Sequence, residues 1–108
     1  MQIDQKMAGD IMVVHITGDI TLNQGGDVLL KDKIQSLLQQ GHRKILLDLG
    51  NVSYVDSAGL GQLVQATVTA SKNGGKLKLL NLTKRLNDLL VVTKLSTVFD
   101  IVEKEGDF

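Results

Sequence analysis

The feature that most constrains the fold is a strand–loop–helix unit in the middle of the chain. Residues 45–49 (ILLDL) form a short, almost continuous apolar run, which is typical of a central strand buried on both faces, or nearly so. A polar loop over residues 50–56 follows it. An amphipathic helix is then indicated by Leu60, Leu63, Val64, Thr67 and Val68. Because a strand followed by a helix usually returns to a parallel strand, this unit predicts an α/β sheet.

The same alternation of strand and helix patterns extends over the rest of the chain. Glycine-rich turns separate the segments, and Thr83 is a suitable N-cap for the third helix. The predicted strands are residues 2–7, 11–17, 44–49, 76–80 and a short last strand at 100–103, and the predicted helices are about 26–40, about 60–73 and about 83–93.

The element order is therefore β-β-α-β-α-β-α-(β). Right-handed crossovers through the helices predict parallel pairing, and the opening hairpin, with its turn at residues 8–10, adds one antiparallel strand. We therefore expect a single domain over residues 1–108, of the α/β class, with a mixed but mostly parallel sheet and about three to four helices. The sequence leaves open whether the helices cover one face of the sheet or both.

Composition excludes several classes of function. Lys and Arg together number 12, as do Asp and Glu, and only 3% of residues are aromatic. A nucleic-acid partner is therefore not expected, because such proteins usually carry a basic surplus or a stacking platform. The chain has no cysteine, no apolar run of membrane-spanning length and no signal-peptide pattern at its start. We expect a cytoplasmic protein that does not insert into membranes.

No set of residues in the sequence predicts catalysis, a cofactor or a metal. Gly74-Gly75-Lys76 is followed by leucine and ends a helix, so it is not a phosphate-binding loop. Ser57 matches the nucleophile-elbow pattern only on its C-terminal side. The two histidines, His15 in a strand and His42 in a turn, are expected to serve local packing or solvation. The sequence therefore does not indicate an enzyme.

Ser57 allows two interpretations. Either Asp56 or Ser57 could simply cap the second helix, since both residue types are favoured N-caps. Alternatively, Ser57 presents a hydroxyl beside free backbone N–H groups, where a phosphate can be accommodated. Gly59 and Gly61 favour the second interpretation, because each costs about 1 kcal/mol relative to alanine inside a helix. Glycine there indicates that a partner, or another part of the same protein, approaches the backbone closely.

The segments around Ser57 resemble a known family. Residues 45–49, Val52 and residues 55–61 (VDSAGLG) resemble the STAS domain family, particularly the bacterial anti-sigma factor antagonists. Weaker similarities extend over nearly the whole chain, at residues 18–20, 74–79 and 95–99. The resemblance implies a STAS-like fold.

The resemblance also implies a function. In this family the serine that matches Ser57 is phosphorylated by an anti-sigma factor that is also a serine kinase. The unphosphorylated protein binds that kinase and frees a sigma factor, and a phosphatase resets the system. The positions expected to contact the partner are Asp19, Thr21, Asp56, Ala58, Gly59 and Leu60. The even charge balance fits a monomer or a weak dimer.

Two positions depart from the family pattern. Ala58 stands where many members have Ser or Thr, which leaves Ser57 as the only candidate acceptor in the motif. Thr21 stands where many members have an aspartate close to the phosphoacceptor. The alternative function is therefore a scaffold subunit of a signalling or lipid-transport assembly, in which Ser57 is not phosphorylated and serves as a helix cap.

Overall fold

The computed structural model describes residues 1–108 and contains one five-stranded sheet, three α-helices and one 3₁₀ turn. The predicted order of strands and helices is confirmed. The elements are β1 (Gln2–Ala8), β2 (Ile11–Thr17), α1 (Gly26–Gln39), β3 (Lys44–Asn51), α2 (Ser57–Lys72), β4 (Lys76–Leu80), α3 (Lys84–Val92), β5 (Asp100–Val102) and the 3₁₀ turn η1 (Glu105–Asp107). No helix of the chain is both long and apolar enough to cross a membrane.

The sheet is mixed, as predicted, and its strands lie side by side in chain order from β1 to β5. β1 pairs with β2 in the antiparallel direction, with Gln2 opposite Thr17 and Ala8 opposite Ile11. The remaining three pairings are all parallel. The antiparallel pair results from the tight hairpin, in which Gly9 has a φ of 64° that favours glycine.

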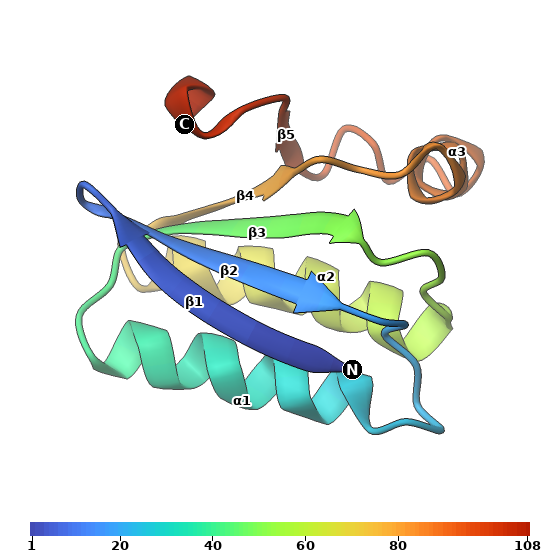
Figure 1. Ribbon diagram of the computed structural model, residues 1–108, viewed down its shortest axis with the longest axis horizontal. Helices are drawn as coiled ribbons and strands as arrows, with labels where there is room; N and C mark the ends of the chain where they lie inside the picture. Colours follow the sequence, from blue (N-terminus) through green and yellow to red (C-terminus); the bar gives the residue numbers. More distant parts are fainter.

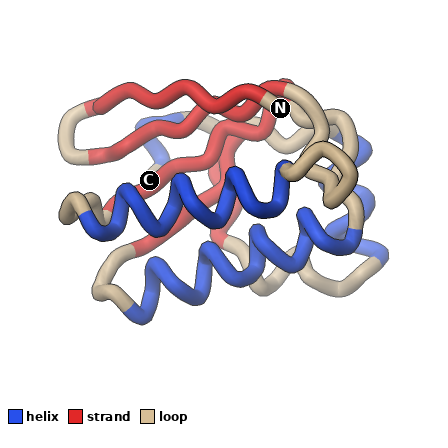
Figure 2. The backbone as a smooth tube through the Cα atoms, turned by 90° about the horizontal axis from the view of Figure 1, so that it is seen from below, coloured by secondary structure: helices blue, strands red, loops and turns tan.

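Helices α1 and α2 lie side by side on one face of the sheet (Figures 1 and 2). The main core lies between these helices and the sheet, and it includes Ile45, Leu47 and Leu49 of β3. A second, smaller cluster of buried residues on the other side of the sheet contains Leu46, together with Val13 and Leu80. Strand β3 is therefore buried on both faces, which is why its sequence is apolar at nearly every position.

The β2–α1 loop and the β3–α2 loop meet where β2 and β3 end. The backbone N–H of Gly18 donates to the carbonyl of Asn51 at 3.1 Å, and that of Ile20 donates to the carbonyl of Tyr54, also at 3.1 Å. Ile20 also forms an isolated parallel β-bridge with Val55. These bonds hold the β2–α1 loop against the β3–α2 loop, directly beside the first turn of α2 (Figure 1).

Candidate partner-binding site at the start of helix α2

Asp56 is the N-cap of helix α2, which decides between the two capping residues that the sequence left open. Its backbone is extended, and its Oδ1 accepts a hydrogen bond of 2.8 Å from the N–H of Gly59. Its Oδ2 accepts a second bond of 2.9 Å, from the N–H of Leu22 in the β2–α1 loop. One carboxylate thus caps the helix and joins the two loops. The helix consequently begins at Ser57, three residues before the predicted start at Leu60.

The carboxylate of Asp56 is stabilised in its charged form. The N–H groups of Leu22 and, second, of Gly59 lower the pKa of Asp56 below the ordinary value for an aspartate, because they donate to the ionised oxygens. Partial burial acts in the opposite direction but is the weaker effect. Asp56 is therefore a fixed negative charge at neutral pH, next to Ser57.

Ser57 occupies the first position of helix α2, and its side chain is exposed. Its hydroxyl makes no hydrogen bond within the chain, because Asp56 provides the cap. The first N–H groups of a helix lack partners inside the helix and carry a partial positive charge. The structure thus places an unpaired, accessible hydroxyl at a position that can accommodate a phosphate group.

The two glycines of the motif serve different purposes. Gly59 is buried, and a Cβ atom there would overlap the carbonyl oxygen of Ile20 and lie 2.9 Å from a Val55 methyl group. Its lack of a side chain is therefore explained by packing inside the protein, and Gly59 is removed from the predicted partner contacts. A Cβ on Gly61 would meet nothing within 4 Å, so packing gives no reason for that glycine.

The structure brings the other predicted contact residues to one edge of the molecule. Asp19 is half-buried and accepts a 3.0 Å hydrogen bond from the hydroxyl of Ser53 in the neighbouring loop. Thr21 is also half-buried, and its carbonyl accepts from the N–H of Gly26 at 2.9 Å. Ala58 and Leu60 lie partly exposed in the first turn of α2.

Two exposed apolar side chains flank this edge and were not among the predicted contacts. Leu22, whose N–H is bound to Asp56, is 62% exposed, and Tyr54, two residues before Asp56, is 44% exposed. A large apolar residue inside a polar loop was the signal that could have identified both. We use the term Ser57 surface for the set of exposed and half-exposed residues at this edge: Asp19, Thr21, Leu22, Tyr54, Asp56, Ser57, Ala58 and Leu60.

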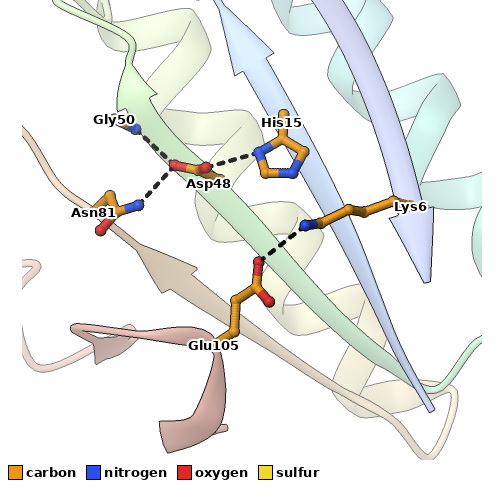
Figure 3. A network of polar contacts seen from close by, with 6 residues as sticks. All are labelled: Lys6, His15, Asp48, Gly50, Asn81 and Glu105. Carbon is orange, nitrogen blue, oxygen red and sulfur yellow. Dashed lines mark hydrogen bonds and ion pairs between the residues drawn. The ribbon is translucent and has the colours of Figure 1, made fainter. Parts of the chain in front are cut away.

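A separate polar cluster lies elsewhere on the sheet, where His15 meets Asp48 (Figure 3). The ring Nδ1 of His15 lies 2.7 Å from Oδ2 of Asp48, and Oδ1 of Asp48 accepts from the N–H of Gly50 and the side-chain amide of Asn81. Sequence reasoning did not identify this pair. No group of three or more His, Cys, Asp or Glu side chains with a metal-binding arrangement occurs in the chain.

Comparison with known proteins places the chain among related sequences. The model of the STAS domain matches residues 2–108. The "Anti-sigma-B factor antagonist" of Bacillus subtilis is 36% identical over 104 residues, which cover 96% of this chain and 93% of that protein.

Solved structures show the same fold. A Thermotoga maritima protein has a TM-score of 0.86 at 22% identity, covering 97% of this chain and 89% of that one. The anti-sigma factor antagonist SpoIIAA of Bacillus was solved in an unphosphorylated and a phosphorylated form. The unphosphorylated form matches with a TM-score of 0.72 at 16% identity, covering 98% of this chain and 92% of that structure. The phosphorylated form matches with the same TM-score at 18% identity, covering 98% of this chain and 96% of that structure. The full-length match to the family model and the identity to the Bacillus subtilis protein show that this chain belongs to the STAS domain family.

Proposed function

We propose that this chain is an anti-sigma factor antagonist whose binding is controlled by phosphorylation of Ser57. In this proposal the unphosphorylated chain acts in the cytoplasm as a monomer or weak dimer, binds an anti-sigma factor that is also a serine kinase, and so releases a sigma factor. A phosphatase restores the binding form. Support comes from the relative of 36% identity, which carries the name of an anti-sigma-B factor antagonist and matches nearly the whole chain.

The observation that carries the proposal is that Asp56, and not Ser57, is the N-cap of helix α2. If Ser57 were the helix cap, its hydroxyl would be occupied by a backbone N–H group. Instead Asp56 is the cap, and the Ser57 hydroxyl is exposed and unpaired. A kinase can therefore reach this oxygen without first breaking a hydrogen bond of the fold.

The electrostatics explain how a phosphate would act at this surface. A phosphoserine adds a charge of about −1.5 to −2 at neutral pH. In the free chain, water and the N-terminus of α2 stabilise that charge. In a complex, the phosphate would be desolvated beside the carboxylates of Asp19 and Asp56, against a partner surface that fits a neutral hydroxyl. A cost of roughly 3 kcal/mol lowers affinity by about 100-fold.

This mechanism requires no change in the backbone. The charge acts at the interface itself, and the helix that bears it is fixed by Asp56 and by the close packing of Gly59 on Ile20. We expect backbone shifts below about 2 Å around α2 on phosphorylation, since larger shifts mark a rearrangement.

The test compares three variants in binding to the purified anti-sigma factor of the source organism. Ser57→Ala should bind as the wild type does. Ser57→Asp should bind at least about 100-fold more weakly, because its negative charge must also be desolvated in the complex, at a cost of roughly 3 kcal/mol. Ser71→Asp is the matched control, because it adds the same charge to an exposed position on the same helix, about 21 Å along the axis. That separation exceeds the screening length of about 8–10 Å, so this variant should bind normally.

Incubation with the same protein and ATP provides the second measurement. We expect an increase in mass of about 80 Da, the mass of one phosphoryl group, at residue 57. Thr21, which stands in place of an aspartate usual in the family, favours the scaffold alternative. Equal binding by Ser57→Ala and Ser57→Asp, with no phosphoryl group incorporated, would reject the switch and favour the scaffold function.

A further inference from the structure

A cavity of about 270 Å³ lies between the β3–α2 loop and helix α3, next to the Ser57 surface. Its walls are largely apolar. Tyr54 and Val55 line it from the loop, and Leu86, Leu89 and Val92 line it from the helix. Val92 is 78% exposed, although it lies at the edge of a ready-made apolar depression. Neither capping nor the proposed phosphorylation of Ser57 makes use of this cavity.

We propose that the cavity receives an apolar side chain of the anti-sigma factor, with an acidic group of that partner beside Arg85. This inference rests on the proposed function and specifies the chemistry of the partner. Binding energy in protein interfaces concentrates in a few side chains that fill pockets, so a preformed apolar pocket beside a binding surface is a suitable anchor site.

A typical protein–protein interface is large enough for one partner to contact both Ser57 and the cavity. Tyr54 and Ser57 are three residues apart, so their Cα atoms are at most about 11 Å apart. A standard interface buries about 800 Å² on each partner, which corresponds to a disc of roughly 16 Å radius. A partner that covers Ser57 at its centre is therefore wide enough to reach the mouth of the cavity as well.

The wall formed by Tyr54 is held in place before any partner binds. The guanidinium of Arg85 lies 5.3 Å from the centroid of the Tyr54 ring, which is the geometry of a cation–π contact. This contact restricts a ring that is 44% exposed, so the ring loses less conformational freedom on binding. The Tyr54 side of the cavity is therefore partly preorganised.

The charges around the cavity favour an acidic group on the partner. Asp88, on the same helix, forms an ion pair of 3.2 Å with Lys84, so each offsets the other's charge. Arg85 also lines the cavity but forms no ion pair in the chain. The edge of the cavity thus carries one uncompensated positive charge, which favours an aspartate or glutamate next to the inserted apolar side chain.

Two matched pairs of variants test the proposal, with equilibrium binding of the full chain to the purified anti-sigma factor as the readout. Val92→Gln makes the cavity edge polar, whereas Val91→Gln alters a neighbouring side chain that is 56% exposed but does not line the cavity. We expect about tenfold weaker binding for Val92→Gln and less than about twofold change for Val91→Gln.

The second pair addresses the charge. Arg85→Gln should weaken binding at low salt, with a smaller effect at high salt, whereas Lys72→Gln, which removes the same charge at the opposite end of α2, should leave binding unchanged. Arg85→Lys should retain most of the salt-dependent part of the binding free energy, since lysine keeps the positive charge. Circular dichroism and thermal melting establish that each variant is folded.

The outcomes separate this inference from the proposed function. If Ser57→Asp abolishes binding while Val92→Gln binds as Val91→Gln does, the switch stands and the cavity proposal is overturned. If the folded wild type does not bind the anti-sigma factor at all, the proposed function itself fails, and the cavity proposal with it. If sedimentation shows that Val92→Gln disrupts self-association of the chain, the occupant is a second copy and the proposal is likewise overturned.

Discussion

Two aspartates of this chain, Asp48 and Asp56, are both half-buried and both accept several hydrogen bonds, yet their surroundings differ. Asp48, near the end of β3, is bound by the side chains of His15 and Asn81 and by one nearby backbone N–H group. Asp56 is bound only by backbone N–H groups, one from a loop and one from a helix.

The difference separates a polar cluster that stabilises the sheet from the surface to which we assign partner binding. The polar groups around Asp48 satisfy one another, so the cluster ties two parallel strands and a loop together and is complete in itself. Asp56 instead fixes the backbone and leaves the adjacent Ser57 hydroxyl unpaired, and the side chains of Leu22 and Tyr54 in the two joined loops are exposed. Under the proposed function, the unpaired hydroxyl on a rigid backbone is a better guide to the binding surface than the concentration of polar groups.

The largest effect should come from the packing beneath Asp56. Gly59→Ala places a methyl group against the carbonyl oxygen of Ile20, and the Asp56 carboxylate resists separation of the two segments because it binds the N–H groups of Gly59 and Leu22. We expect a loss of at least about 2 kcal/mol in the free energy of unfolding, measured with urea.

Gly61→Ala is the matched control for that substitution, since its Cβ would meet nothing within 4 Å. It should raise the free energy of unfolding by about 0.5–1 kcal/mol, the helix propensity difference between glycine and alanine. If Gly61 keeps the surface open to the partner, this stabilised variant should bind the anti-sigma factor more weakly. Equal stability of the two variants would contradict the tight packing inferred for Gly59.

The comparison of the two aspartates can be tested directly with Asp48→Ala. This change removes the partner of His15 and Asn81, and we expect the free energy of unfolding to fall by about 1–2 kcal/mol. Binding to the anti-sigma factor should stay within about twofold of the wild type, because ordinary surface changes away from an interface have small effects.

Asp56→Ala, in contrast to Asp48→Ala, should impair binding to the anti-sigma factor as well as stability. It releases the Leu22 loop and the first turn of α2 together, so the binding surface loses its fixed geometry. Binding measured well below the melting temperature should weaken more than for Asp48→Ala. Stronger impairment of binding by Asp48→Ala would mean that the functional surface lies on the sheet and not at the start of α2.

The sequence predicted the features that depend on local patterns. Apolar periodicity and glycine stops identified every strand and α-helix in the correct order, and they placed Ser57 where a strand gives way to a helix. The start of α2 was placed three residues late, because the apolar periodicity begins only at Leu60 and the cap depends on Asp56 being bound from another loop.

The features that the sequence did not predict depend on contacts between distant residues. His15 and Asp48 pair because β2 and β3 are in a register that places them opposite each other, and register cannot be read from either strand alone. Gly59 was attributed partly to a partner, since only the folded chain shows that Ile20 lies against it. The exposure of Leu22 likewise depends on how its loop is held.

The smallest expected effect concerns the charge of Asp56 and is measured as a function of pH. Because its pKa is lowered in the folded state by the N–H groups of Leu22 and Gly59, the folded chain holds the proton of Asp56 less tightly than the unfolded chain does. The resulting stabilisation is present above the ordinary aspartate pKa of about 3.9 and is lost as the pH falls through the lower folded value.

Asp56→Asn isolates this contribution, because asparagine is also a favoured N-cap but does not ionise in this range. It keeps one oxygen for Gly59 or Leu22 and loses the other, so at pH 7 it should be less stable than the wild type. The gap in the free energy of unfolding should narrow as the pH is lowered from 5 to about 3, because only the wild type loses the contribution of this carboxylate. The pKa of Asp10 is also lowered, by its hydrogen bond to Lys44, but that pair is present in both proteins and cancels in the difference. A gap that stays constant over this range would mean that the shape of the cap, and not its charge, fixes the start of helix α2.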